Sequence, residues 1–258
     1  MISQVWIGRT LRLLAALLLL AVLAACEDNQ SVKEVQVPPG KGTEQSPFLM
    51  YVGDEYTEIP ISAYGTYYFV LSDTTKNRMH SVNITSDEDL DLRMYDPQTD
   101  SFSGITCTPF RPDGNESCWV VGYTTFTNVY FTVTAAHIDG ESTSFGVSTL
   151  ADFTASESIK GGFFIDYYGF GPPGRTVTIR LQADTENFAA TLWDSFTPPT
   201  QLTFPGNAGI PDECDVNYSG TGADETCPGP ALSSDPPFLA EVTNYGATQD
   251  FTLTLTAP

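Results

Sequence analysis

Apolar and polar residues alternate in short runs along most of the chain after residue 47. Such alternation is typical of β-strands, because successive side chains of a strand point to opposite faces of its sheet. Glycine, proline, asparagine and aspartate separate the runs, as expected of turns. No window shows the apolar period of an amphipathic helix. The pattern therefore predicts an all-β fold, with strands in segments 67–71, 82–84, 90–94, 129–133 and 145–147.

The same order of segments occurs twice, which indicates an internal repeat. The matching pairs are 65–69 with 161–165, 82–84 with 179–181, 92–96 with 190–194, 130–133 with 239–242, and 145–148 with 251–254. Each copy has about 100 residues and many short strands, which suits a β-sandwich. We therefore predict two tandem β-sandwich domains, 49–150 and 151–258, with the aromatic runs 67–69 and 163–165 in their cores.

The amino terminus carries a short apolar run, Leu13–Cys26, that follows Arg9 and Arg12. The run has 14 residues, whereas a transmembrane helix needs about 20. Its end, Leu-Ala-Ala-Cys, resembles the lipobox of bacterial lipoprotein signal peptides. This resemblance implies that residues 1–25 are removed and that a lipid such as palmitate is attached to Cys26. We expect a cell-envelope protein anchored in the outer membrane or at the cell surface rather than in the inner membrane.

A polar segment rich in proline and glycine follows the lipobox, and it shows no periodicity. We predict that residues 26–48 hold the lipidated cysteine and a flexible linker. Some 20 flexible residues have a root-mean-square reach of about 25 Å. Such a linker separates the folded part from the membrane without fixing its orientation.

Four cysteines remain beyond Cys26, and in an exported chain they are expected to form disulfides. Their spacing predicts two local loops, Cys107–Cys118 and Cys214–Cys227. A zinc site is disfavoured, because neither pair has the two-residue spacing of zinc ligands and no histidine lies close by.

Charge narrows the range of partners. Without Arg9 and Arg12 the chain keeps 32 acidic and 9 basic residues, a formal charge of −23. This field repels nucleic acid and anionic lipid surfaces, and no cluster of lysine or arginine offsets it. Hydrophobic residues still make up 41% of the chain, which is enough for packed cores. We therefore expect a folded protein that does not bind nucleic acid.

Several motifs of the first copy resemble the bacterial pre-peptidase C-terminal (PPC) domain. They are the acidic strand 87–95, the disulfide loop from Cys107-Thr-Pro to Glu116-Ser-Cys118, and the strand 130–133. The likeness covers most of residues 50–150, and the second copy is degenerate, with Asn187 and Ala189 in place of Asp89 and Asp91. It implies a jelly-roll-like β-sandwich that acts as a non-catalytic accessory. Some members of this family bind collagen or polysaccharide, often with calcium.

Asp87, Asp89 and Asp91 lie in the densest cluster of carboxylates, and calcium is held by six to eight oxygens. Strand alternation places Asp89 and Asp91 on the same face and Glu88 on the other. Two interpretations remain open: a calcium site in the first copy, or solvated acids at the edge of a strand. We expect no other cofactor.

Candidate catalytic groups are few. General base catalysis near neutral pH is most often performed by histidine, and the chain has only His80 and His137. His80 matches Val177 of the second copy, so a packed structural role is predicted for it. The chain shows no nucleophile elbow, zinc-protease motif or phosphate-binding loop. We therefore expect no enzymatic activity.

Aromatic residues in turns and at strand ends are the remaining candidates for function, either as a binding platform or as ordinary packing at the sandwich edges. They are Tyr51, Tyr56, Tyr64, Tyr123, Phe126, Tyr167, Tyr168, Phe170 and Tyr245. The sequence thus predicts a binding or interaction module with a protein or polysaccharide partner. The alternative is a carbohydrate- or matrix-binding surface protein, assisted by calcium.

Overall fold

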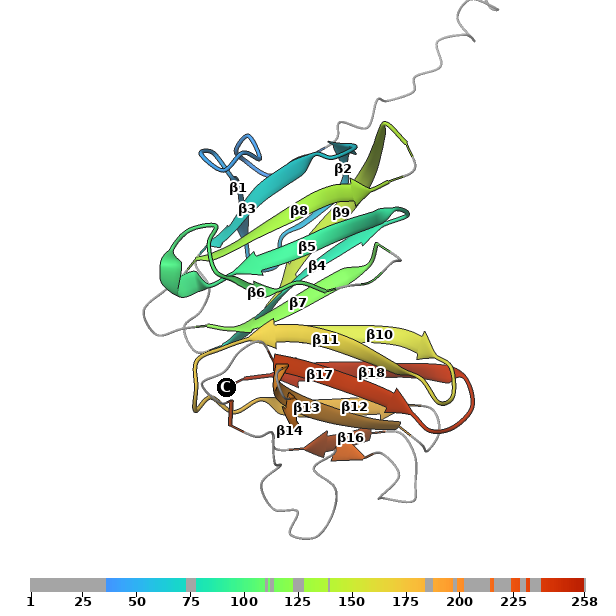
Figure 1. The fold of residues 1–258 in the computed structure, drawn as a ribbon. Coiled ribbons are helices and arrows are strands. Elements are labelled where there is room, and N and C mark those ends of the chain that lie inside the picture. The colour runs from blue at the N-terminus through green and yellow to red at the C-terminus, as the bar shows by residue number, and fades with distance from the viewer. Residues whose placement is uncertain are drawn as a thin grey trace, which may run out of the picture. The chain divides into compact units, whose positions relative to one another are not determined.

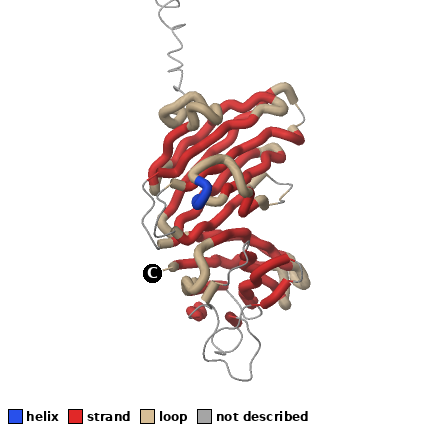
Figure 2. Tube along the Cα trace, turned by 60° about the vertical axis from the view of Figure 1, so that its left-hand side comes forward, coloured by secondary structure: helices blue, strands red, loops and turns tan. Residues whose placement is uncertain are grey.

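The computed structural model describes residues 36–72, 78–109, 111, 114–122, 128–138, 140–183, 188–196, 199–201, 214–215, 224–227, 231–232 and 238–257. Residues 36–258 form one compact unit. In the described ranges the regular structure consists of strands and one short 3-10 turn, η1 (Pro97–Thr99), as Figure 2 shows. The prediction of an all-β fold is confirmed.

The strands run in chain order through two halves of the unit, residues 36–150 and 151–258 (Figure 1). The first half contains β1 (Phe48–Tyr51), β2 (Glu55–Ser62), β3 (Thr66–Ser72), β4 (Met79–Ser86), β5 (Asp89–Tyr95), β6 (Ile105–Cys107), β7 (Glu116–Val121), β8 (Val129–His137) and β9 (Ser142–Leu150). The second half contains β10 (Phe153–Ile159), β11 (Phe164–Phe170), β12 (Thr178–Ala183), β13 (Phe188–Phe196), β14 (Pro199–Gln201), β15 (Cys214–Asp215), β16 (Asp224–Cys227), β17 (Phe238–Asn244) and β18 (Gln249–Thr256).

Each half is a sandwich of two sheets with the same strand order. In the first half, β3-β8-β5-β6 packs against β2-β9-β4-β7. In the second half, β11-β17-β13-β14 packs against β10-β18-β12-β16. Apolar residues of both sheets meet in each core because alternate side chains of every strand point inward. The internal repeat inferred from sequence is thus visible in the strand pairing.

One strand belongs to both halves. The β7 strand is the last strand of its own sheet, and it also pairs in parallel with β11, where Trp119 lies opposite Gly169. In the first half, β1 pairs in parallel with β3 at the equivalent edge. The result is one continuous sheet with the order β14-β13-β17-β11-β7-β4-β9-β2. The two sandwiches are therefore joined through backbone hydrogen bonds as well as through the chain connection.

The two cores exchange side chains at this seam. Trp119 of β7 is fully buried among residues of the second half, and Phe170 of β11 is fully buried among residues of the first. The Trp119 indole donates a hydrogen bond from Nε1 to the Tyr167 carbonyl (3.1 Å) and stacks on Phe238 with ring centroids 6.2 Å apart. A Cβ at Gly169 would lie 1.9 Å from Trp119 Cδ2, so glycine is required beneath the ring.

The core assignment of segment 163–165 is wrong for its two phenylalanines. Thr66 begins β3 opposite Thr134, and Phe164 begins β11 opposite Thr243 at the equivalent register. Phe164 therefore corresponds to Thr66, two residues away from the match that the sequence suggested. Phe163 consequently lies in the turn before the strand, and both phenylalanines are 60% exposed. In the first copy Phe69 is fully buried, as expected, with Tyr67 and Tyr68 half-buried beside it.

Residues 36–47, which the sequence placed in the linker, contact the first sandwich. The Leu49 amide donates to the Pro39 carbonyl (2.7 Å), and the Tyr68 amide donates to the Gly42 carbonyl (3.1 Å). A Cβ at Gly42 would lie within 3 Å of the rings of Phe48 and Tyr67. Residues 36–47 therefore belong to the first sandwich rather than to a flexible linker. Cys26 and the rest of segment 1–35 lie outside the described residues.

Candidate functional site

The three aspartates proposed as calcium ligands lie around the start of β5. Asp89 and Asp91 occupy alternate, half-exposed positions of the strand, and Asp87 lies in the turn before it. Across the described part of the chain, no group of three or more histidine, cysteine, aspartate or glutamate side chains is arranged to hold a metal ion. The structure therefore does not bring these three carboxylates together as a metal centre.

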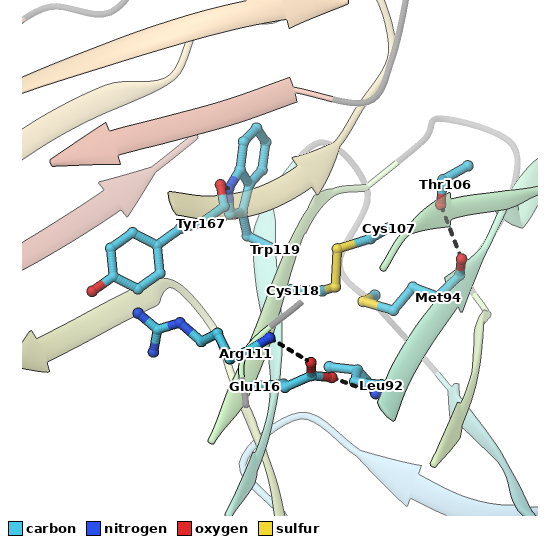
Figure 3. The surroundings of a disulfide bond; sticks show 9 residues. All are labelled: Leu92, Met94, Thr106, Cys107, Arg111, Glu116, Cys118, Trp119 and Tyr167. Carbon is cyan, nitrogen blue, oxygen red and sulfur yellow. Dashed lines mark hydrogen bonds between the residues drawn. A yellow bond between two sulfur atoms is a disulfide. The ribbon is translucent and has the colours of Figure 1, made fainter. Parts of the chain in front are cut away.

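Glu116 is a buried carboxylate for which no separate role was predicted from sequence. It lies on β7, where its Oε2 accepts a hydrogen bond from the Leu92 amide of the facing sheet and its Oε1 accepts one from the Arg111 amide (3.2 Å) (Figure 3). Burial raises the pKa of Glu116 to about 7, although the two amide bonds oppose the shift, and the charges of Asp91 and Asp89 raise it further. Through these two hydrogen bonds Glu116 connects β5 to the loop that the disulfide closes.

We expect Glu116 to make stability depend on pH. Because its pKa is raised to about 7 in the folded state, from the ordinary value of 4.5, the stabilisation is complete below pH 4.5 and is lost as the pH rises through 7. The loss amounts to roughly 2 to 3 kcal/mol. Urea unfolding between pH 4.5 and 8 measures it, and Glu116→Gln should remove this part of the pH dependence. An unchanged profile in this variant would contradict the assignment, and Glu141→Gln, at an exposed site, is the control.

Arg111 joins the two halves beside this carboxylate. Its guanidinium binds Glu157 of β10 through Nη1–Oε1 (2.7 Å) and Nη2–Oε2 (3.1 Å), and its Cζ lies 5.1 Å from the centroid of the Tyr167 ring. Tyr167 donates its hydroxyl to the same glutamate Oε1 (2.9 Å). Asp166 lies nearby on β11, and burial raises its pKa to about 6, with the Glu241 charge adding to the shift and Arg111 opposing it. The ion pair and the ring contact of Arg111 therefore stabilise the association of the two halves.

The predicted disulfide between Cys107 and Cys118 is confirmed, and both residues are buried in the first core. It joins β6 to β7 across the loop that carries Arg111 (Figure 3). Cys227 is also disulfide-bonded. The side chain of its predicted partner, Cys214, lies outside the described residues, so that pairing stays a prediction.

The histidines differ in what the structure describes. His80 lies on β4 and is 1% exposed, in keeping with the packed role predicted for it. His137 ends β8, and its side chain lies outside the described residues. His80 is therefore not placed where a substrate in solvent could reach it.

The aromatic candidates divide into buried and exposed residues. Tyr167 and Phe170 are core residues, so of the two alternatives packing holds for them and a surface platform does not. Tyr56 and Tyr168 are half-buried, and Tyr123 and Phe126 lie outside the described residues. The exposed members are Tyr51 (46%), Tyr64 (86%) and Tyr245 (59%), and Phe163 and Phe164 join them.

Three of these residues lie in two neighbouring turns, which we call the aromatic tip: Phe163 and Phe164 before and at the start of β11, and Tyr245 after β17. The Asn244 amide donates to the Phe163 carbonyl (3.0 Å), and the Gly162 amide donates to the Asn244 carbonyl (2.7 Å). The buried Asn244 side chain also binds the carbonyls of Ile159 (2.9 Å) and Ala247 (2.7 Å). These bonds lock the two turns together, so the rings stand on a rigid base.

Comparisons with known sequences give no relative. No protein-family model matches the chain, and no curated protein matches it either. Within the described ranges, no helix has the length and apolarity needed to cross a bilayer.

Several solved structures show a distant likeness to this chain. The periplasmic inhibitor of g-type lysozyme from Salmonella Typhimurium is 10% identical, with a TM-score of 0.27, and the match covers 42% of this chain and 87% of that protein. The PBSX exported protein XepA is 9% identical, with a TM-score of 0.28, over 80% of this chain and 87% of its own. An archaeal virus protein with a triple jelly-roll fold is 10% identical, with a TM-score of 0.25, over 80% and 59%. The β-sandwich architecture therefore rests on the strand pairing described above.

Proposed function

We propose that the protein is a non-enzymatic lipoprotein of the cell envelope that acts as a binding or interaction module. The observation that supports this proposal most directly is the exposure of the aromatic tip. Its three rings are each about 60% exposed and come from two turns that are bonded to each other, whereas most other large apolar side chains of the described residues fill the two cores. Aromatic residues on a rigid base are the usual anchors of protein interfaces, because they bury a large area at a small loss of conformational entropy.

A retention experiment tests the binding function. The full chain, held in neutral detergent and immobilised on beads, is challenged with envelope extract separated into protein and polysaccharide fractions. We expect defined proteins to be retained by the wild type and lost by Phe163→Ser/Phe164→Ser. The matched control is Tyr51→Ser/Leu150→Ser, which alters an exposed residue pair away from the tip. Equal retention by all three proteins would contradict a role for the tip.

A second candidate is a carbohydrate- or matrix-binding protein, as in the PPC family to which we assign the two sandwiches. Exposed aromatic rings favour it, since their faces can stack on sugar rings. Retention of the polysaccharide fraction that depends on the tip would support this candidate instead. Loss of that retention with a chelator would restore the calcium assignment.

The lipid anchor is testable at Cys26. Cells grown with radioactive palmitate should label the wild type, because the thiol of Cys26 carries the lipid. We expect Cys26→Ser to abolish the label and to move the protein from the detergent phase to the aqueous phase on phase separation. A Cys227→Ser variant serves as control, since its lipidation should be unchanged. Label retained in Cys26→Ser would refute the lipobox assignment.

A further inference from the structure

Strand direction places a second exposed aromatic residue at the same end of the continuous sheet as the aromatic tip. The β11 strand runs parallel to β7, and β7, β4, β9 and β2 alternate in direction. The end of β2 and the start of β11 therefore lie at one end of the sheet, and the end of β17 joins them because it is antiparallel to β11. Figure 1 shows the β2–β3, β10–β11 and β17–β18 turns on its right-hand side. Tyr64 follows β2, so it shares this end with the tip.

Tyr64 holds a conformation that favours glycine. Its φ is +62°, and its side chain is 86% exposed. The equivalent residue of the second half, by the matching hydrogen bonds of the two turns, is Gly162 with a φ of +79°. A tyrosine in this region costs about 1–3 kcal/mol relative to an unstrained residue. Stability alone would favour glycine here, so the exposed ring does not contribute to the stability of the turn.

The spacing of the two aromatic positions suits one extended contact. β2 and β11 are separated by β9, β4 and β7. Four steps between neighbouring strands amount to about 19 Å. A partner must therefore span roughly 20 Å to touch Tyr64 and the aromatic tip together, which a protein interface of standard size does.

The negative charge of the chain favours a positively charged partner. The whole chain has a formal net charge of −21, so a second copy of itself and anionic lipid are both repelled. The faces of aromatic rings attract lysine and arginine side chains. Acids flank both positions: the carbonyl of the exposed Glu141 accepts from the Ala63 amide beside Tyr64 (2.9 Å), and the exposed Asp250 lies at the start of β18. Lys160, also exposed, precedes Gly161 in the turn of the tip.

We propose that this end of the sheet, formed by Tyr64 and the aromatic tip with Glu141 and Asp250, is the docking surface for a basic protein. The inference rests on the proposed binding function and names the class of its partner. The partner's arginine and lysine side chains lie over the exposed rings, and the negative field of the chain speeds the encounter.

Fluorescence anisotropy tests this surface with the full chain in neutral detergent. The probe is a labelled twelve-residue peptide of alternating arginine and leucine. An acidic peptide of equal length and labelled dextran are the other two probes. We expect the basic peptide alone to bind, and its Kd to rise at least tenfold in Tyr64→Ser/Phe163→Ser/Phe164→Ser/Tyr245→Ser. The control Tyr51→Ser/Leu150→Ser should bind like the wild type, and Lys160→Glu should lower the Kd about threefold.

Tyr64→Gly separates lost binding from lost folding. It relieves the left-handed strain, so the variant should be at least as stable as the wild type while its Kd for the basic peptide rises. Equal binding by the aromatic and control variants, or binding of dextran that depends on the rings, would overturn the proposal. If the basic peptide does not bind while the aromatic tip still retains envelope proteins, the partner is not a basic protein, but the proposed binding function stands. If neither the basic peptide nor any envelope protein binds, the proposed binding function is wrong as well.

Discussion

Replacing Trp119 with alanine should lower the free energy of unfolding by about 3–5 kcal/mol. The indole is fully buried, stacks on Phe238 and donates to the Tyr167 carbonyl, so its loss leaves a cavity and an unpaired acceptor in the second core. Because β7 belongs to the sheets of both halves, we expect a single unfolding transition that moves as a whole. Urea unfolding followed by far-ultraviolet circular dichroism measures the change.

The matched control is Trp193→Ala. Trp193 is half-buried and donates its Nε1 hydrogen to Thr191 Oγ1 (2.9 Å) within its own strand, so its loss should cost about 1–2 kcal/mol. Two separate transitions in Trp119→Ala, with the first half unaffected, would contradict the coupling of the halves through β7.

Gly169 offers a test of the same contact from the other side. In the wild type, Gly169→Ala places a methyl group into the Trp119 ring and should cost about 3 kcal/mol. In the Trp119→Ala background the same change should cost under about 1 kcal/mol, because the ring is gone. Additive costs would show that the strain lies elsewhere.

Removing the first disulfide should be the next most damaging change. Cys107→Ala/Cys118→Ala is expected to lower the free energy of unfolding by about 3 kcal/mol, since the bond closes a loop with a sequence separation of 11. The buried Glu116 holds the same loop to Leu92 and its stabilisation is lost only as the pH rises through 7, so we expect the variant to stay folded at mildly acidic pH. Its unfolding midpoint in urea should fall well below that of the wild type.

The reduced wild type provides the comparison for this variant. A reducing agent should bring the wild type towards the stability of Cys107→Ala/Cys118→Ala and leave the variant less affected. A variant as stable as the oxidised wild type would show that the bond does not constrain the unfolded chain.

Much of the fold follows from local sequence pattern. Strand alternation located β3, β4, β5, β8 and β9, and the matched segments 130–133 and 239–242 occupy equivalent places in β8 and β17. The Cys107–Cys118 bond was predictable from its short spacing together with the expectation that the chain is exported. These features are local or repeated, so a single sequence contains enough information to predict them.

The candidate site was harder to predict, because its residues depend on register and on long-range contacts. A two-residue offset at the start of β11 moved Phe163 and Phe164 from the expected core to the surface. The burial of Glu116 was not predicted, because the residue was interpreted only as part of the motif around Cys118. A single acidic residue next to the apolar positions of a strand could have indicated that it is buried. Nothing local to Arg111 indicates Glu157, which lies 46 residues away.

By itself the sequence determined that the chain is all-β, that it is acidic and contains a tandem repeat, and that a disulfide joins Cys107 to Cys118. These properties depend on the period of side chains along a strand, on net charge and on short-range spacing. Only the tertiary structure decided that β7 serves both sandwiches, that Trp119 completes the second core, and that Tyr64 shares an end of the sheet with Phe163. Each of these depends on which strand edges pair, and edge pairing is set by the packing of whole sheets, which no local pattern encodes.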